Sequence, residues 1–390
     1  MMWSETTSLA DTAAASPLVF RNARIVTETE VVDGTMQVDA GVIASINERG
    51  EQAGMEVDCG GDYLLPGFID VHTDHFEKHA LPRAGVFWPT LSAVLVYDAV
   101  VTAAGITTVF DSLCLGAAGK PYRKKLLRDI IQGIRTARDA GLLRAEHLLH
   151  LRCDILDPEL EAQLNEYIDE PTLRFLTVMD DSAVRRSDEY YRRVQRSRGA
   201  VSDEEVEARL RESHANDPVI AARMRPWVVQ MAKDRGIPVA NHDDTRASDI
   251  AEAQALGVSI LEFAITDEAA LAAQAAGMTV IAGAPNVVNG GSHFGNVAAA
   301  DLVERGIAQI LCSDYVPASL VQAAFMLAEG KEGLSLPAAV ATISANPARV
   351  FGLADRGTLC AGKRADIVRV SMIENTPVIK AVWRAGRRII

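Results

Sequence analysis

Apolar runs separated by stretches of helical periodicity recur through the central part of this chain. This alternation is typical of βα units around a parallel sheet, because a strand buried on both faces has a nearly continuous apolar sequence. Eight candidate strands are found, which is the number in a TIM barrel. They cover residues 63–72, 105–111, 147–154, 173–180, 237–243, 259–265, 278–285 and 308–314. The sequence therefore predicts an α/β fold built on a TIM (β/α)8 barrel.

The two ends of the chain show a different pattern, that of short antiparallel strands. Residues 18–46 alternate apolar and polar side chains, with turns predicted at Asp33-Gly34 and Ala40-Gly41, and residues 357–370 and 376–389 again show short strands with glycine turns. Because neither end has enough strands to bury a sheet face alone, we expect them to pair. The predicted division is a disordered tail (1–16), a composite β-sandwich domain (17–62 and 354–390) and the barrel (63–353).

The longest connection between predicted strands covers residues 187–235 and is highly charged. It contains a capping box that begins at Ser202 and ends at Glu205, which predicts a helical insertion rather than a linker. Charged helical residues are usually solvated, so contact with a ligand is the less favoured expectation for the arginines of this region. These are Arg185, Arg186, Arg192, Arg193 and Arg196.

Composition excludes several classes of function. The 390 residues include 39 Lys and Arg against 52 Asp and Glu, and the net charge of −13 would repel a nucleic-acid backbone. An uncharged apolar run of roughly 18 residues, as a membrane span needs, is not found, and the opening segment does not resemble a signal peptide. The five cysteines are scattered without a C-x-x-C pair, which argues against a disulfide framework and favours a cytoplasmic location.

Acidic and imidazole side chains stand at the ends of most predicted barrel strands. In the first strand, His72 and Asp74 are two residues apart, so both are expected to point to one face. The others are Asp154, Asp180-Asp181, His242, Glu262 and Asp314. An isolated residue of this kind is more often a cap, but the strand ends of a barrel converge on one opening. Several carboxylates and two imidazoles there would need a neutralising cation, which predicts a divalent metal centre.

A glycine-rich loop follows the seventh predicted strand, from Pro285 to Asn296. Gly290, Gly291 and Gly295 allow close backbone approach, and loops at this place in TIM barrels often bind phosphate. The candidate substrate-binding residues of the loop are Asn286, Gly290, Gly291, Ser292 and His293, and the basic candidates near the same opening include Lys78, Arg83, Arg152 and Arg246. An ordinary turn or lid is the equally weighted alternative. Nucleophilic catalysis is less favoured, since G-x-S-x-G is absent and Cys153 and Cys312 lie in apolar strands.

The sequence LLPGFIDVHTD, followed late in the chain by SANPARVFGL and GTLCAGKRADIV, resembles the amidohydrolase superfamily. That resemblance implies a metal-dependent TIM barrel with a β sandwich formed by both chain ends. The segments HTDHFEKH, NHDD, GAPNVVNGGSHFGNVAA and CSDYVPASL are similar to the family of alpha-D-ribose 1-methylphosphonate 5-triphosphate diphosphatases. The similarity covers nearly everything after the first twenty residues.

The resemblance implies that His72, Asp74, His242 and Asp314 bind the metal, with Asp154 as a bridging carboxylate and catalytic roles for Asp314 and His242. At residues 179–185 family members commonly have Met-Asp-His, whereas this chain has Asp181 in place of the histidine. An oxygen donor there favours harder cations, so Mn²⁺ or Mg²⁺ are alternatives to Zn²⁺, which remains the first expectation. One or two ions are expected.

The implied reaction is hydrolysis of the substrate triphosphate to the 5-phosphate and pyrophosphate, in phosphonate catabolism by the carbon-phosphorus lyase pathway. Asp314 would take the proton of the attacking water. Two alternatives remain open at this point: amide, deacetylase or deaminase hydrolysis on another small substrate, and a non-catalytic subunit that binds a phosphonate nucleotide. The expected partner is a small phosphorylated sugar phosphonate, without nucleic acid or membrane, and a homo-oligomer is left open.

Overall fold

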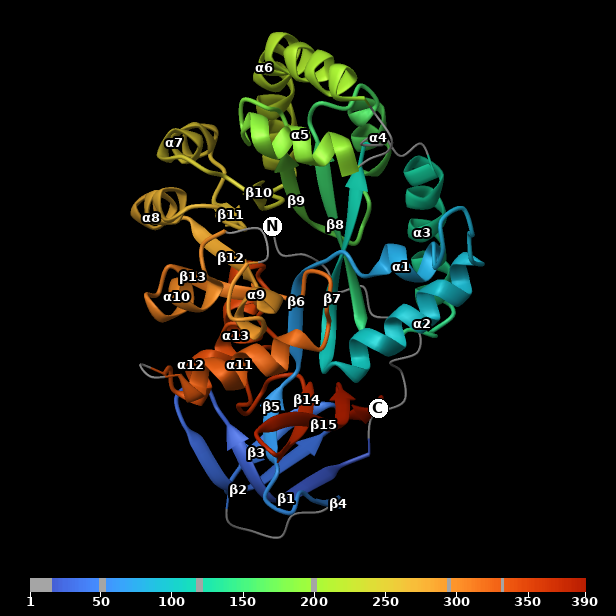
Figure 1. Cartoon of the computed structure of the whole chain (residues 1–390). Helices are drawn as coiled ribbons and strands as arrows, with labels where there is room; N and C mark the ends of the chain where they lie inside the picture. Colours follow the sequence, from blue (N-terminus) through green and yellow to red (C-terminus); the bar gives the residue numbers. More distant parts are fainter. Residues whose placement is uncertain (1–15, 49–53, 117–121, 198–201, 293–295, 331–332) are drawn as a thin grey trace.

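The computed structural model describes residues 16–48, 54–116, 122–197, 202–292, 296–330 and 333–390. These residues form two eight-stranded sheets, one parallel and one that combines both ends of the chain. Figure 1 shows the parallel sheet and its surrounding helices above the sheet of the two chain ends. The predicted α/β barrel with a second domain from both chain ends is confirmed.

The parallel sheet is a TIM-like barrel whose strands follow one another in chain order. They are β6 (Phe68–Thr73), β7 (Ile106–Leu115), β8 (Glu146–Asp154), β9 (Leu173–Met179), β10 (Val239–His242), β11 (Ile260–Glu262), β12 (Thr279–Gly283) and β13 (Ala308–Cys312). A parallel bridge between Thr73 and Asp314 joins the first strand to the segment after the last. The backbone N–H of Asp74 donates to the carbonyl of Asp314 at 2.6 Å. The barrel therefore closes at the residues that were predicted to carry chemistry.

Apolar side chains fill the barrel below its open end. Ile69, Phe110, Phe175 and Ile310 belong to one buried cluster that also includes residues from the other barrel strands. Phe351 closes the opposite end, with its ring centroid 4.8 Å from that of Phe110. Because a TIM barrel interior is a packed core and not a pore, the chemistry is confined to the carboxyl ends of the strands.

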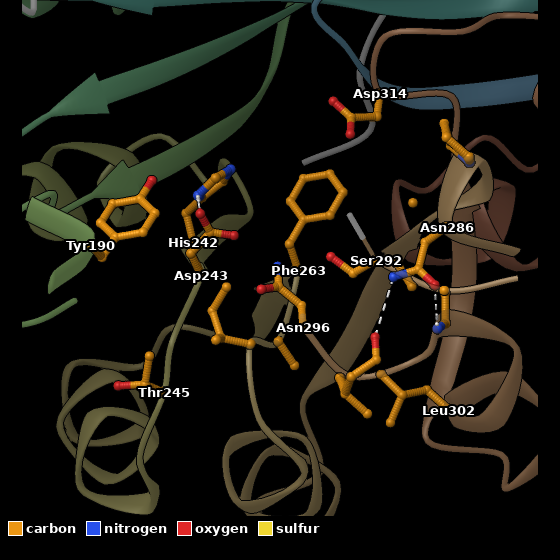
Figure 2. A pocket seen from close by; sticks show the side chains of 18 of the residues that line it. Tyr190, His242, Asp243, Thr245, Phe263, Asn286, Ser292, Asn296, Leu302 and Asp314 are labelled. Atoms are coloured by element: carbon orange, nitrogen blue, oxygen red, sulfur yellow. Dashed lines mark hydrogen bonds and ion pairs between the residues drawn. The ribbon is translucent and has the colours of Figure 1, made fainter. Parts of the chain in front are cut away.

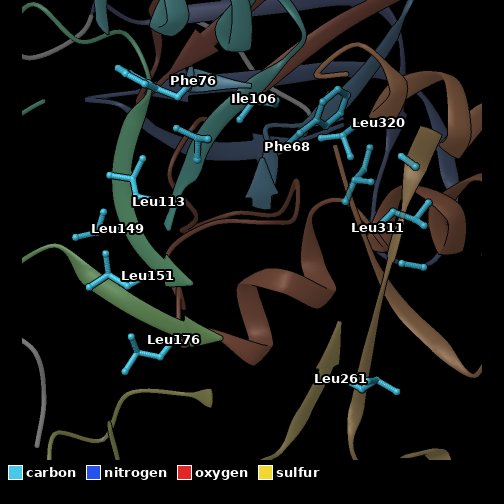
Figure 3. Packing of buried hydrophobic residues seen from close by; sticks show 14 of the residues in the cluster. Phe68, Phe76, Ile106, Leu113, Leu149, Leu151, Leu176, Leu261, Leu311 and Leu320 are labelled. Carbon is cyan, nitrogen blue, oxygen red and sulfur yellow. The ribbon is translucent and has the colours of Figure 1, made fainter. Parts of the chain in front are cut away.

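The helices cover the outside of the barrel and bury the outward faces of its strands (Figure 1). Figure 3 shows part of this packing, with Leu113, Leu149 and Leu151 on neighbouring strands. Burial of each such side chain stabilises the fold by roughly 1.5–3 kcal/mol.

None of the helices in the described residues is long and apolar enough to cross a membrane. The helices are α1 (Phe76–Ala80), α2 (Thr90–Ala103), α3 (Tyr122–Asp139), α4 (Leu160–Tyr167), α5 (Asp188–Ser197), α6 (Asp203–Lys233), α7 (Ala247–Leu256), α8 (Asp267–Ala275), α9 (Ala284–Val288), α10 (Ala299–Glu304), α11 (Ser319–Glu329), α12 (Leu336–Ala341) and α13 (Ala345–Val350).

The long insertion between β9 and β10 is helical, as the sequence predicted, and consists of α5 and α6. The capping box at the start of α6 is formed: the Ser202 hydroxyl accepts from the backbone N–H of Glu205, whose carboxylate accepts from the backbone N–H of Ser202. Helix α6 continues through Pro218 and Pro226. The insertion rises above the barrel opening and places α5 near the ends of β9 and β10 (Figure 1).

The second sheet joins the two ends of the chain in the order β16-β15-β14-β5-β1-β2-β3, with β4 beside β1. Backbone bonds between Ile43 and residues 362–363 bring β3 next to the segment before β14, so the sheet folds back on itself. Phe20 and Trp383, 4.9 Å apart, pack edge to face inside it. The strands are β1 (Leu18–Val26), β2 (Val31–Asp39), β3 (Val42–Ile46), β4 (Met55–Asp58), β5 (Tyr63–Pro66), β14 (Ile367–Ile373), β15 (Thr376–Arg384) and β16 (Arg387–Arg388).

Two sequence predictions about strands are wrong. The run 63–72 is two strands, because the chain crosses at Gly67 from the terminal sheet to the barrel. A side chain at Gly67 would collide with Thr107, since a Cβ there would lie 2.3 Å from the Thr107 hydroxyl. The turn predicted at Asp33-Gly34 is absent, and both residues lie within β2. Gly34 instead makes room for Asn47, whose side-chain oxygen accepts from the backbone N–H of Thr35 at 2.8 Å.

Glu146, at the start of β8, connects the lower end of the barrel to the C-terminal segment. Its Oε2 lies 2.6 Å from Nη1 of Arg356 and 2.7 Å from Nη1 of Arg364. Burial acts to raise the pKa of Glu146, but the two guanidinium groups lower it, and the net result is a pKa of about 2. The carboxylate is therefore charged over the whole neutral range and holds the C-terminal segment against the barrel.

Candidate metal centre

A cavity of about 560 Å³ lies at the carboxyl ends of the barrel strands. Figure 2 shows His242 and Asp314 among the side chains around this cavity, together with Tyr190 and Phe263. The cavity is lined by residues from several barrel strands, from the loops that follow them and from α5. Because these residues are far apart in the sequence, a local sequence motif does not reveal the cavity. His72, Asp74, Arg152, Arg186 and Arg193 line the same cavity.

His72 is held in one orientation by a buried carboxylate. Its Nδ1 lies 2.9 Å from Oε1 of Glu262, and because an ionised carboxylate only accepts, Nδ1 carries the proton. The other oxygen of Glu262 accepts from Thr177 at 2.7 Å, and His150 Nε2 lies 2.7 Å from the same hydroxyl. Nε2 of His72 is thereby directed toward Asp74. A carboxylate behind an imidazole in this way is the usual support for a metal-binding histidine.

The pKa of His72 is unusually high for a buried imidazole. Burial acts to lower the pKa of His72, but the facing carboxylate of Glu262 raises it to about 10. A divalent cation bound at Nε2 would displace the proton there, so metal binding would release a proton from this group.

Asp74 and Asp314 complete a group of three donors with His72. One ligand atom of each lies within 4.8 Å of the others, close enough to hold one ion. Nε2 of His72 is 3.7 Å from Oδ1 of Asp74. Burial raises the pKa of the Asp314 carboxyl. Two carboxylates and one imidazole suit Zn²⁺ as well as the harder Mn²⁺ and Mg²⁺, and they leave coordination positions open, so the residues present fit a catalytic divalent metal.

His242 also has a carboxylate near its Nδ1, but the geometry there is not that of a hydrogen bond. Its Nδ1 is 3.2 Å from Oδ2 of Asp243, while its Nε2 is 3.5 Å from Nη2 of Arg152. Arg152 also forms an ion pair with Asp74 through Nη1. Burial acts to raise the pKa of Asp74, but Arg152 holds it well below its usual value. Arg152 thus lies between Asp74, which follows the first barrel strand, and His242, at the end of the fifth.

Backbone strain is concentrated at this rim. Asp243, Phe263 and Asp314 have φ values of 58°, 57° and 53°, a region that residues other than glycine seldom occupy. Each follows a short barrel strand directly or within two residues. Strained conformations of this kind cost about 1–3 kcal/mol each and collect at functional sites, where the surrounding fold enforces them.

Three of the predicted metal ligands lie outside the three-donor group: His242, described above, and the carboxylates of Asp154 and Asp181. Asp154, at the end of β8, accepts from the backbone N–H of Leu156 and stabilises the following turn. Asp181 forms an ion pair at 2.8 Å with Arg186. In the described residues neither carboxylate belongs to a group of three donors spaced for one ion.

The predicted substrate-binding residues divide between the cavity and its surroundings. Arg152, Asn286, Gly291 and Ser292 line the cavity, whereas Gly290 lies next to it. The Asn286 amide is bonded to Val297 and Ala299, which fixes the ends of the loop (Figure 2). His293 falls outside the described residues. Lys78 donates to the carbonyl of Tyr315 at 3.3 Å, and Arg83 is exposed; neither lines the cavity.

Several residues in or directly behind the cavity were not selected from the sequence. Glu262 was recognised only as a strand-end residue, since its contact with His72 joins positions 190 residues apart. His150 lies inside β8, where a histidine on an apolar strand resembles an ordinary core residue. Arg186 and Arg193, expected to be solvated, line the cavity near Tyr190, with their guanidinium carbons 5.2 and 5.3 Å from its ring centroid.

Comparison with known proteins places the chain in a family. The amidohydrolase family model matches residues 217–390. The alpha-D-ribose 1-methylphosphonate 5-triphosphate diphosphatase of Escherichia coli is 37% identical over 381 residues, covering 95% of this chain and 100% of that protein. This chain belongs to the amidohydrolase superfamily and to the family of that diphosphatase. The resemblance stated from the sequence is confirmed.

More distant amidohydrolases share the fold. The imidazolonepropionase of Deinococcus deserti is 26% identical over 418 residues, covering 98% of each chain. The N-acetylglucosamine-6-phosphate deacetylase of Pasteurella multocida superposes with a TM-score of 0.62 at 13% identity, covering 95% of this chain and 99% of the other. A D-hydantoinase structure gives 0.58 at 17% identity, covering 96% and 95%. The superfamily is generally metal-dependent, in agreement with the donor group at the barrel opening.

Proposed function

We propose that this amidohydrolase is a metal-dependent diphosphatase that cleaves alpha-D-ribose 1-methylphosphonate 5-triphosphate to the 5-phosphate and pyrophosphate, within phosphonate catabolism. The observation that carries the proposal is the 37% identity to the Escherichia coli diphosphatase along the full length of that protein. A small phosphorylated sugar phosphonate is the proposed partner. We also propose a cytoplasmic location, which rests on the scattered cysteines.

The proposed metal ligands at the centre are His72, Asp74 and Asp314, with His242 close by. Zn²⁺ is the first candidate, and Mn²⁺ or Mg²⁺ are the alternatives. When bound, a divalent ion there supplies Lewis acidity and lowers the pKa of a water toward about 7. Asp154 and Asp181 are retained as weaker candidates, because a change of side-chain rotamer would be needed to free them from the contacts described above.

The side chains at the opening supply positioning and proton transfer. Asp314 is the proposed acceptor of the proton from the attacking water, since its carboxylate faces the cavity and burial raises its pKa. Glu262 keeps His72 in a fixed ring orientation and tautomer. His242, which lines the same cavity as Asp314, is proposed to act beside it at the reacting phosphorus.

The cationic wall of the cavity supports a polyphosphate substrate. Arg152, Arg186 and Arg193 line it, as do Gly291 and Ser292 of the glycine-rich loop. Arg193 is exposed and lines the cavity beside Tyr190, and it is the proposed contact of the outer phosphates, whereas Arg186 forms ion pairs with Asp181 and Asp243. Guanidinium groups bind phosphate oxygens in a bidentate manner, which favours phosphate over an uncharged amide substrate. Lys78, Arg83 and His293 remain further candidates for phosphate binding.

Phosphorus NMR of the products tests the proposed reaction. Purified protein with Zn²⁺, Mn²⁺ or Mg²⁺ is incubated with the ribose methylphosphonate triphosphate, and separately with N-acetylglucosamine 6-phosphate and with a hydantoin. Formation of pyrophosphate and the 5-phosphate from the first compound alone is expected. Hydrolysis of an amide compound without pyrophosphate release would favour the amidase alternative, and stoichiometric binding of the triphosphate without turnover would favour a binding subunit.

A further inference from the structure

The side chain of Arg152 extends from the interior of β8 into the centre of the proposed metal site. Its side chain is 12% exposed, and its guanidinium reaches two residues that otherwise have no connection. Nη1 forms an ion pair with Asp74, and Nη2 lies 3.5 Å from Nε2 of His242. Since guanidinium stays protonated in proteins, this position is occupied by a permanent positive charge.

His242 presents to Arg152 the atom that would otherwise face a metal ion. Nη2 of Arg152 can only donate, so Nε2 of His242, 3.5 Å away, presents its lone pair to the guanidinium. Asp74 is shared in the same way, between the donor group of His72 and Arg152. Asp74 and His242 thus share one cationic partner, the guanidinium of Arg152, directly beside the donor group of His72.

The charges of the opening agree with this arrangement. The charged groups that line the cavity, together with buried Glu262, are five carboxylates and three guanidinium groups, so one divalent ion balances the remaining two negative charges. They are Asp74, Glu189, Asp243, Glu262 and Asp314 against Arg152, Arg186 and Arg193. A second divalent ion would leave a positive excess in a buried site, which is costly. We propose that the guanidinium of Arg152 fills the second cation position, so that the centre holds one divalent ion. This inference rests on the proposed metal centre but not on the proposed substrate.

Metal stoichiometry of the full chain tests the proposal. The wild type, Arg152→Gln and Arg152→Lys are stripped with a chelator, loaded with Zn²⁺ alone, desalted and measured by elemental analysis. We expect one ion per chain in the wild type and in Arg152→Lys, which keeps a cation, and two in Arg152→Gln. Two ions in the wild type, or one in a folded Arg152→Gln, would overturn the inference. A wild type without bound metal would overturn both the inference and the proposed centre, whereas one ion without pyrophosphate release would remove only the substrate.

Electron paramagnetic resonance with Mn²⁺ alone gives a second readout that needs no variant. An isolated ion gives the spectrum of a single Mn²⁺, whereas two ions sharing Asp74 would be magnetically coupled. We expect the uncoupled spectrum from the wild type at every Mn²⁺ loading, and a coupled spectrum from Arg152→Gln where that variant folds by circular dichroism. A coupled pair in the wild type would refute the role of Arg152.

Discussion

Replacement of Glu146 by glutamine tests how the C-terminal segment is attached to the barrel. The folded pKa of Glu146 is about 2 against an ordinary value of 4.5. A tenfold change in proton affinity corresponds to about 1.4 kcal/mol, so the charge contributes about 3 kcal/mol to stability. Because the side chain is 30% exposed and glutamine keeps some hydrogen bonds, we expect Glu146→Gln to lower the free energy of unfolding by about 2 kcal/mol at neutral pH.

The pH dependence of that loss has a definite sign. A carboxyl whose pKa is lowered by folding stabilises the protein above its unfolded pKa, and the contribution disappears as the pH falls through the folded pKa. The difference between wild type and variant in urea unfolding should therefore be constant from about pH 8 to about pH 6 and shrink from about pH 4.5 downward. Glu161→Gln is the matched control, since the ion pair of Glu161 within the described residues is an exposed one, with Arg223 at 3.9 Å. A difference under about 0.5 kcal/mol at neutral pH, or one that grows with acid, would refute the reasoning.

Three further changes probe the site. Asp314→Asn should reduce turnover at least about a hundredfold while the thermal unfolding midpoint stays near that of the wild type, and near-normal turnover would exclude proton transfer by Asp314. Glu262→Gln should weaken Zn²⁺ binding about 10- to 100-fold in a competition titration, because it releases the ring of His72; unchanged affinity would exclude the positioning role. Arg193→Ala should raise KM for the triphosphate with little change in kcat, whereas Arg196→Ala on the same helix, outside the cavity, should leave KM unaltered; equal effects of the two would show that only overall charge matters.

The general architecture could be predicted because it depends on periodicity and position. Alternating apolar runs specify a barrel, and a barrel brings strand ends together whatever their separation in sequence. His72, Asp74 and Asp314 were therefore expected to meet, and the structure brings them within 4.8 Å of one another. The break at Gly67 was not predicted, because an apolar run gives no sign of passing from one sheet into another.

The finer features of the site depend on side-chain contacts that periodicity does not encode. Asp181 stands at a strand end like the other acidic residues, but Arg186, five positions later, forms an ion pair with it. Arg152 looked like one basic residue among several, and only its length and direction bring it to both Asp74 and His242. The folded barrel sets the relative positions of these side chains, so their contacts cannot be predicted from the periodicity of the sequence.

The central claim is that the donors at the barrel opening hold a divalent ion needed for triphosphate cleavage. The most direct test measures pyrophosphate released from alpha-D-ribose 1-methylphosphonate 5-triphosphate by chelator-stripped protein, before and after Zn²⁺, Mn²⁺ or Mg²⁺ is added back. We expect the stripped protein to be inactive and at least one of these ions to restore turnover. Full activity of the stripped, metal-free protein, or no pyrophosphate with any of the three ions, would contradict the claim.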